Sequence, residues 1–552
     1  MHKSKDLLIS FSKSFLFVGD VMHKYINEEK NRSETTKGAF SLLLSVIFVK
    51  LIGFIYKVPL SHILGDEGMG YFNSAYTIFA FFYMLCSGGV PRAVSILITE
   101  YSVKGREKDI EYLLRASVLF FGGIGAFFAL LFLLFPGTIS SMIGNGDAAN
   151  SLMVIAPSLI FVSISGVFRG YLSGKGSFVS IAISEVLDAA LKFIVGLLFA
   201  IIAKTHSLSA ATISAYTIFG VTIGSFISSI FLFISVNIQK AKHKSKQNDR
   251  ATVSLKDVLS AVIRISLPIT TSSAVMGISN IIDLGSIMKR LINGGMSIEN
   301  AVAVYGNFTT LAVPMFNLAT ALISPLSTSA LPAFAALSIK NERARLGEEL
   351  SKCLCNASLL CSPLAFAYLL FPKEILMLLF NDASARYAAP LLSILSYGVL
   401  IVPALTVINT FLEATGHQKL TLLSMSICAA IKLSVGVILL ERYGIYGAPL
   451  GTVISYLCAL VISLTLAIIK ERISLAVFHS YFLFAFFAFS AVLISRSIYL
   501  HFGKGIYSPS LFLSSVFVAA IIYFILLVLF YSRNIKMRSF FVKITKKSEA
   551  NL

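Results

Sequence analysis

Apolar runs of about 20 residues alternate with short polar segments along most of the chain, from residue 38 to residue 531. Roughly 20 helical residues cross a bilayer core, and helices and closed barrels are the two structures that can span one. The length of these runs favours helices and predicts 14 transmembrane spans. The predicted spans are 38–57, 71–94, 112–136, 150–169, 178–203, 209–237, 257–283, 306–330, 351–372, 388–412, 418–440, 446–469, 474–495 and 508–531.

The composition agrees with an all-α polytopic membrane protein. The 552 residues are 56% hydrophobic and 13% charged, with a mean hydropathy of +0.83. A soluble domain is nearer one-quarter charged. The net charge of +19 resembles that of a nucleic-acid binder. Its charges lie in short loops and tails between apolar spans, however, so nucleic acid is not an expected partner.

The positive charges predict the orientation of the chain. Most of the 46 Lys and Arg residues fall on the side of the N-terminus. Cytoplasmic loops carry this excess, so both termini are expected in the cytoplasm. Two alternatives remain open for residues 1–37: an interfacial helix within a cytoplasmic tail, or a segment that begins upstream of a true start at Met22.

An internal repeat divides the chain. Tyr71-Phe-Asn73 and Tyr305-Gly-Asn307 stand 234 residues apart, and Lys192-Phe-Ile-Val-Gly196 and Lys432-Leu-Ser-Val-Gly436 stand 240 apart. Chance similarity between apolar helices is the alternative. A repeat of six spans preserves orientation, so the two halves would be related by a pseudo-two-fold axis along the membrane normal, with a substrate site between them.

This repeat predicts six regions. They are a tail at 1–37, a six-helix lobe at 38–237, a basic cytoplasmic linker at 238–256, a second six-helix lobe at 257–469, two additional helices at 470–531 and a basic tail at 532–552.

Three lysines lie in the middle of apolar spans: Lys50, Lys192 and Lys432. A charge at the bilayer centre costs about 3 kcal/mol or more, so such residues usually face a protein-lined or watery cavity. Asp188 lies four residues before Lys192, with Glu185 on the same helical stripe, so an ion pair that only packs is one interpretation. Asp188 and Glu185 cannot neutralise all three lysines. The positive charge that remains suits an anionic substrate.

Four other charged residues lie at membrane depth. Arg92 and Arg264 would either bind substrate or extend to the inner headgroups. Asp283 and Glu413 would serve a coupling cation or proton, or cap a helix. The eight His show no metal-ligand spacing, and there is no phosphate-binding loop or nucleophile motif, so neither a metal, a cofactor nor an enzyme is expected.

Several motifs resemble one family. Lys37-Gly-Ala-Phe40, Gly89-Val-Pro-Arg92, Phe168-Arg-Gly-Tyr171, Ser266-Leu-Pro-Ile269 and Tyr443-Gly-Ile-Tyr-Gly447 are similar to segments of polysaccharide-type flippases. These belong to the multidrug/oligosaccharidyl-lipid/polysaccharide exporter superfamily. Within it, the chain resembles the group of stage V sporulation protein B and MurJ-like lipid II flippases.

The resemblance implies a flippase of the bacterial cell membrane. It implies export of an undecaprenyl-diphosphate-linked saccharide, such as lipid II or a related cell-wall precursor, through a central cationic cavity that Lys50 and Lys57 face. Some relatives hold sodium with an Asn and an acid on span eleven. The matching positions here are Lys432 and Gly436, so sodium is not expected there.

The expected partners are a lipid-linked anionic saccharide, membrane lipids and cell-wall synthesis enzymes. Two alternatives are a drug/cation antiporter of the same superfamily and a membrane enzyme acting on lipid-linked glycan. The predicted substrate-binding residues are Lys50, Lys57, Arg92, Lys192, Arg264 and Lys432, and the predicted coupling or charge-pairing residues are Glu185, Asp188, Asp283 and Glu413.

Overall fold

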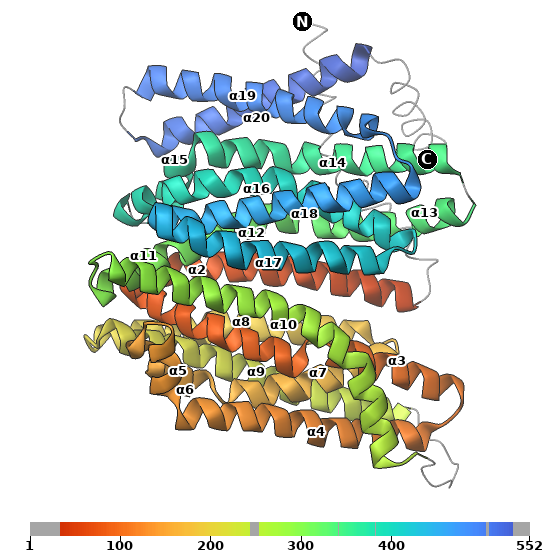
Figure 1. Ribbon diagram of the computed structural model, residues 1–552. Coiled ribbons are helices and arrows are strands. Elements are labelled where there is room, and N and C mark those ends of the chain that lie inside the picture. Colours follow the sequence, from red (N-terminus) through yellow and green to blue (C-terminus); the bar gives the residue numbers. More distant parts are fainter. Residues whose placement is uncertain (1–33, 243–252, 341, 381, 504–506, 534–552) are drawn as a thin grey trace, which may run out of the picture.

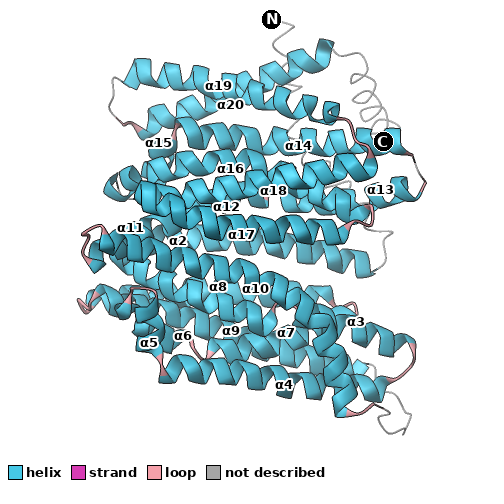
Figure 2. Ribbon diagram, viewed as in Figure 1, coloured by secondary structure: helices cyan, strands magenta, loops and turns pink. Residues whose placement is uncertain are grey.

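The computed structural model describes residues 34–242, 253–340, 342–380, 382–503 and 507–533. Every regular element within these ranges is a helix, as Figure 2 shows, which confirms the all-α prediction. Most of the N-terminal tail, the C-terminal tail after Arg533 and residues 243–252 of the basic linker lie outside the described residues.

The first half of the chain forms one very long helix followed by a series of shorter ones. The elements are α2 (Glu34–Ser87), α3 (Val90–Val103), α4 (Glu107–Leu134), α5 (Pro136–Met142), η1 (Gly146–Ala148), α6 (Ala149–Ile155), α7 (Ser158–Gly174), α8 (Phe178–Thr205) and α9 (Ala210–Lys242).

The second half begins with another long helix and then a broken one. The elements are α10 (Leu255–Asn293), α11 (Ile298–Asn307), η2 (Phe308–Ala312), α12 (Val313–Ala321), α13 (Ile323–Ile339), α14 (Arg343–Leu370), α15 (Pro372–Leu379), α16 (Asp382–Ala414), α17 (Gln418–Tyr443), η3 (Gly444–Tyr446), α18 (Gly447–Glu471), η4 (Leu475–Phe478), α19 (His479–Gly503) and α20 (Pro509–Arg533).

Length and apolar character qualify nine helices of the described residues to cross a membrane, or ten if a pair bent by 44° at residues 156–157 counts as one span. Two of the nine, Phe48–Ser102 and Gln418–Glu471, are 55 and 54 residues long, enough for two passes each. The first contains Gly65, whose φ of 68° interrupts the helical backbone. The total of 14 spans remains a prediction.

The long helices lie roughly side by side, with α19 and α20 at one edge of the molecule and α4 at the other (Figure 1). Helix α8 packs against α2 and α9, while α16 packs against α14 and α18. Two large groups of buried apolar side chains hold the bundle together, and α10 contributes to both. Its Val258 and Val262 join the group around α3, α4 and α7, whereas its Leu284 and Ile287 join the group that contains α16.

Glycines permit the closest approach between α2 and α11. A Cβ atom at Gly70 would lie 2.2 Å from the Val302 carbonyl oxygen, and one at Gly306 would lie 2.3 Å from the Asp66 carbonyl oxygen. Small residues let membrane helices bring their backbones together in this way.

We expect Gly70→Ala to destabilise the protein by about 1–3 kcal/mol, because the added methyl group must push α2 away from α11. The measurement is the midpoint of thermal unfolding in detergent. Gly123→Ala on α4 is the matched control, since a Cβ there meets nothing within 4 Å. Equal midpoints for the two variants would contradict the close packing.

Candidate functional site: a two-lysine cavity

One cavity of about 470 Å³ contains two of the predicted substrate-binding lysines. Helix α2 contributes a stripe of residues at positions i, i+3, i+4 and i+7, which share one helix face. The stripe is Lys50, Gly53, Phe54 and Lys57. The opposite wall consists of Val313, Pro314, Asn317, Leu318, Thr320 and Ala321 from α12, with Val402 and Thr406 from α16.

The cavity is electropositive because its two ammonium groups have no counter-ion. Lys50 is exposed and Lys57 is half-buried, and no acid within the described residues forms an ion pair with either. The Lys57 Nζ donates a hydrogen bond to the Thr309 carbonyl oxygen at 2.8 Å. No acidic residue is among those that line the cavity. An anion would be attracted to this site by both charges.

Lys192 lies elsewhere, in an ion pair on its own helix. Its Nζ is 3.0 Å from Asp188 Oδ2, and both side chains are about a quarter exposed. The pairing of residues four apart on α8 is as the sequence predicted. Glu185 accepts a hydrogen bond from the Ser45 hydroxyl of α2 at 3.2 Å.

Lys432 also has an acidic partner, but on another helix. Its Nζ lies 2.7 Å from Asp283 Oδ2, so the pair joins α17 to α10. The sequence suggested charge pairing for Asp283 without identifying its partner. Gly436, one turn after Lys432, is buried where α17 approaches Gly451 of α18. Two of the three mid-span lysines therefore have counter-ions, and Lys50 does not.

The remaining predicted site residues do not line the cavity. Arg92 on α3, Arg264 on α10 and Glu413 at the end of α16 are all exposed, and none has an ion-pair partner within the part of the chain that is described. Their proposed roles in substrate binding or coupling remain predictions.

Polar contacts fasten α2 to the 298–321 segment, which comprises α11, η2 and α12. We call this set of contacts the polar seam. Its pairs are Lys57–Thr309 at 2.8 Å, Asp66–Asn307 at 3.0 Å, Asn73–Thr310 at 2.7 Å and Thr77–Tyr305 at 3.2 Å. The repeat-matched Asn73 and Asn307 each reach across to the other helix. A pseudo-two-fold relation between the halves would produce such a reciprocal contact.

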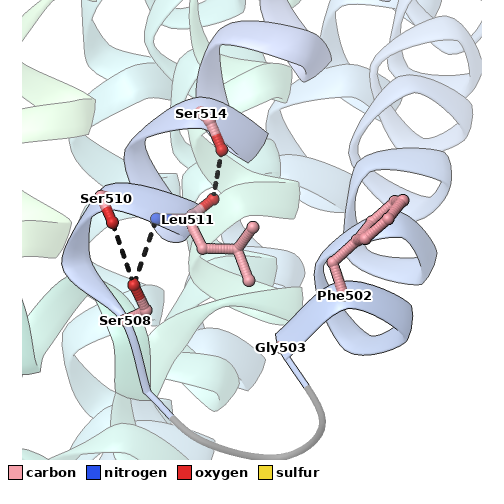
Figure 3. Close-up of a pocket in the computed structure, with 6 residues that line it drawn as sticks. All are labelled: Phe502, Gly503, Ser508, Ser510, Leu511 and Ser514. Atoms are coloured by element: carbon pink, nitrogen blue, oxygen red, sulfur yellow. Dashed lines mark hydrogen bonds between the residues drawn. The ribbon is translucent and has the colours of Figure 1, made fainter.

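A second cavity, of about 520 Å³, lies where α19 meets α20. Figure 3 shows Phe502 and Leu511 beside three serines, with the Ser514 hydroxyl donating to the Leu511 carbonyl oxygen at 2.8 Å. None of its six lining residues is charged. It is therefore a weaker candidate for an anionic ligand than the cavity between Lys50 and Lys57.

Sequence reasoning missed the polar residues opposite the lysines. Asn317, Thr320 and Thr406 line the cavity, and Asp66 anchors the polar seam. Asn317 and Thr320 lie three residues apart in an apolar span, which places them on one helix face. That spacing was an available signal. Within the described residues, no group of three His, Cys, Asp or Glu side chains could hold a metal ion.

The fold and cavity are those of a polytopic helical membrane transporter. The family model described as "Polysaccharide biosynthesis protein" matches residues 35–338, more than half of the chain. The protein belongs to this family, within the exporter superfamily that its motifs resemble. A second family model, MatE, matches residues 268–438.

Two curated relatives from Bacillus subtilis (strain 168) are similar over most of their length. Stage V sporulation protein B is 23% identical over 421 residues, which cover 76% of this chain and 80% of that protein. Lipid II flippase MurJ is 22% identical over 447 residues, covering 78% of this chain and 81% of that protein.

A solved structure shares the fold. The structure titled "Lipid II flippase MurJ, inward closed conformation" matches with a TM-score of 0.69 and 17% identity, covering 89% of this chain and 98% of that one. This match confirms the predicted architecture of a polytopic membrane protein.

We expect the Lys432–Asp283 pair to contribute measurably to stability, because both side chains are mostly buried, with 14% and 26% of their surface exposed. A double-mutant cycle with Lys432→Gln and Asp283→Asn should give a coupling energy of about 1–3 kcal/mol from thermal unfolding in detergent. The exposed pair Arg386–Asp382 is the control, with a smaller expected coupling because water screens both of its charges. A coupling no larger than the control would show that the pair does not hold α10 to α17.

Proposed function

We propose that the protein is a flippase that moves an undecaprenyl-diphosphate-linked saccharide, such as lipid II or a related cell-wall precursor, from the inner to the outer leaflet by alternating access. The observation that carries this proposal is the cavity between Lys50 and Lys57, in which two ammonium groups lack a counter-ion. A diphosphate is a suitable ligand because ammonium–phosphate hydrogen bonds are charge-assisted and strong.

The opposite wall of the cavity suits the rest of such a ligand. Asn317, Thr320 and Thr406 offer amide and hydroxyl groups that can hydrogen-bond to sugar hydroxyls. Membership of the polysaccharide biosynthesis protein family supports a saccharide-containing substrate. The similarity to a protein named lipid II flippase supports a peptidoglycan precursor in particular.

A drug/cation antiporter is the second candidate, favoured by the MatE match over residues 268–438. Such a protein would need an acid in its cavity to bind a cationic drug. The residues that line this cavity include two lysines and no acid, so the flippase is the better proposal. The proposed transport breaks no covalent bond, unlike the reaction of a membrane enzyme acting on the glycan.

The flippase proposal includes the orientation of the chain in the membrane and its division into two lobes. We place both termini on the cytoplasmic side of a bacterial cell membrane, with six-helix lobes at 38–237 and 257–469 and two additional helices at 470–531. The cavity then lies between α2 of the first lobe and α12 with α16 of the second. Enzymes that build the cell wall would supply and consume the lipid-linked saccharide.

We expect Lys50→Ala to reduce lipid II translocation by about tenfold or more, because a hydrogen bond to a charged group contributes about 1.5–3 kcal/mol. The assay measures lipid II in the outer leaflet of cells that are depleted of their own flippase and supplied with this protein. Lys419→Ala, at an exposed position at the start of α17, is the control, since it removes the same charge away from the cavity.

Rescue by the wild type and by Lys419→Ala, but not by Lys50→Ala, would support the proposal. Failure of the wild type to rescue, with the protein present in the membrane, would overturn lipid II as the substrate. Transport of a cationic drug by that same wild type would favour the antiporter instead.

A further inference from the structure

The turn η2 leaves one backbone carbonyl without its helical donor. In this π-helical turn the Val313 N–H donates to the Phe308 carbonyl oxygen, five residues earlier, instead of to Thr309. The next residue, Pro314, has no N–H to offer. An α-helix would supply the Thr309 carbonyl with the N–H of residue 313, and a π-helix with that of residue 314. The first is used by Phe308 and the second does not exist, so the Thr309 carbonyl has no helical donor.

Lys57 satisfies this carbonyl from a distant part of the chain. Its ammonium lies 2.8 Å from the Thr309 oxygen, 252 residues further along the sequence. An unpaired carbonyl in an apolar environment is costly, so this hydrogen bond stabilises the turn as well as the contact between α2 and η2. An ammonium has three donors, and Thr309 is the one described partner of Lys57.

Lys57 is also where the cavity and the polar seam meet. Among the described residues that form the seam, Lys57 alone lines the two-lysine cavity. Helices α2 and α11 lie side by side (Figure 1), and Thr309, the partner of Lys57, follows the end of α11 by two residues. An anion that binds Lys57 in the cavity therefore contacts a residue of the polar seam directly.

We propose that Lys57 couples ligand binding to helix release: a diphosphate that enters the cavity takes the Lys57 ammonium from the Thr309 carbonyl and so loosens the seam between α2 and the 298–321 segment. This inference rests on the proposed function and adds a trigger to it. A phosphate oxygen is a stronger acceptor for an ammonium than a neutral carbonyl oxygen is. Once Lys57 turns to the phosphate, the Thr309 carbonyl of η2 has no donor, and the contact between η2 and α2 weakens.

Lys50 provides a comparison within the same cavity. It carries the same charge on the same face of α2, yet no hydrogen bond or ion pair ties it to a described residue. Both lysines attract the ligand under this scheme, but Lys57 alone transmits its arrival. Substitution of the two residues should therefore have different consequences.

The test is hydrogen–deuterium exchange of peptides covering residues 305–318, with the full chain in lipid nanodiscs and farnesyl diphosphate as the probe. In the wild type we expect saturating probe to increase exchange in these peptides, because η2 loses its donor. In Lys57→Gln, which keeps a neutral donor for Thr309, saturating probe should cause no increase. In Lys50→Gln the probe should bind about tenfold more weakly but still cause the increase at saturation.

Pro314→Ala gives an independent variant that leaves both lysines intact. The restored N–H can serve the Thr309 carbonyl, so Lys57 is free for the ligand. We expect this variant to bind farnesyl diphosphate about 2- to 10-fold more tightly than the wild type, with a smaller increase in exchange.

The outcomes separate the two proposals. Saturable binding to the wild type without any change in exchange would overturn the coupling and leave the proposed function intact. An increase in Lys57→Gln as large as in the wild type would also overturn the coupling. The absence of saturable binding to the wild type would overturn the proposed function, and the coupling with it.

Discussion

A polar group inside a bilayer must find its partner within the protein, because the hydrocarbon core offers none. The arrangement of the described helices around the cavity follows from this constraint. Pro314 of α12 offers no backbone donor to the Thr309 carbonyl of η2, and the Lys57 ammonium of α2 takes that place. The π-helical turn η2, which precedes the α12 wall of the cavity, is therefore stabilised by α2. The same lysine of α2 brings a positive charge to the cavity.

The two repeat-matched lysines meet the same constraint in different ways. Lys192 pairs with an acid on its own helix, whereas Lys432 pairs with Asp283 on α10. The first pair neutralises charge within α8 and joins that helix to no other. The second fixes α10 to α17, and α10 also packs among the buried apolar side chains around α3 and α4. Helix α10 therefore joins the second half to the first, together with the polar seam and the close contact between α2 and α11.

Hydropathy and charge predicted the helices well, because a bilayer span is a local property of about 20 residues. Phe178 and Gln418 begin helices α8 and α17 as predicted. The Lys192–Asp188 pair was also predictable from its spacing. The Lys432–Asp283 pair and the Lys57–Thr309 hydrogen bond were not, because they join residues 149 and 252 positions apart and depend on how helices pack. The π-helical turn beside Pro314 has no local signal beyond the proline itself.

The spacing of the two cavity lysines gives the proposed transport a direction. Lys50 and Lys57 are seven residues apart on one helix face, a rise of about 10 Å along α2. In the orientation that we propose, with the N-terminus inside, Lys50 would lie closer to the cytoplasm and Lys57 closer to the outside. A diphosphate arriving from the inner leaflet therefore meets the free ammonium first and the one bonded to Thr309 second. The polar seam, which begins at Lys57, would be loosened only after the ligand has passed Lys50.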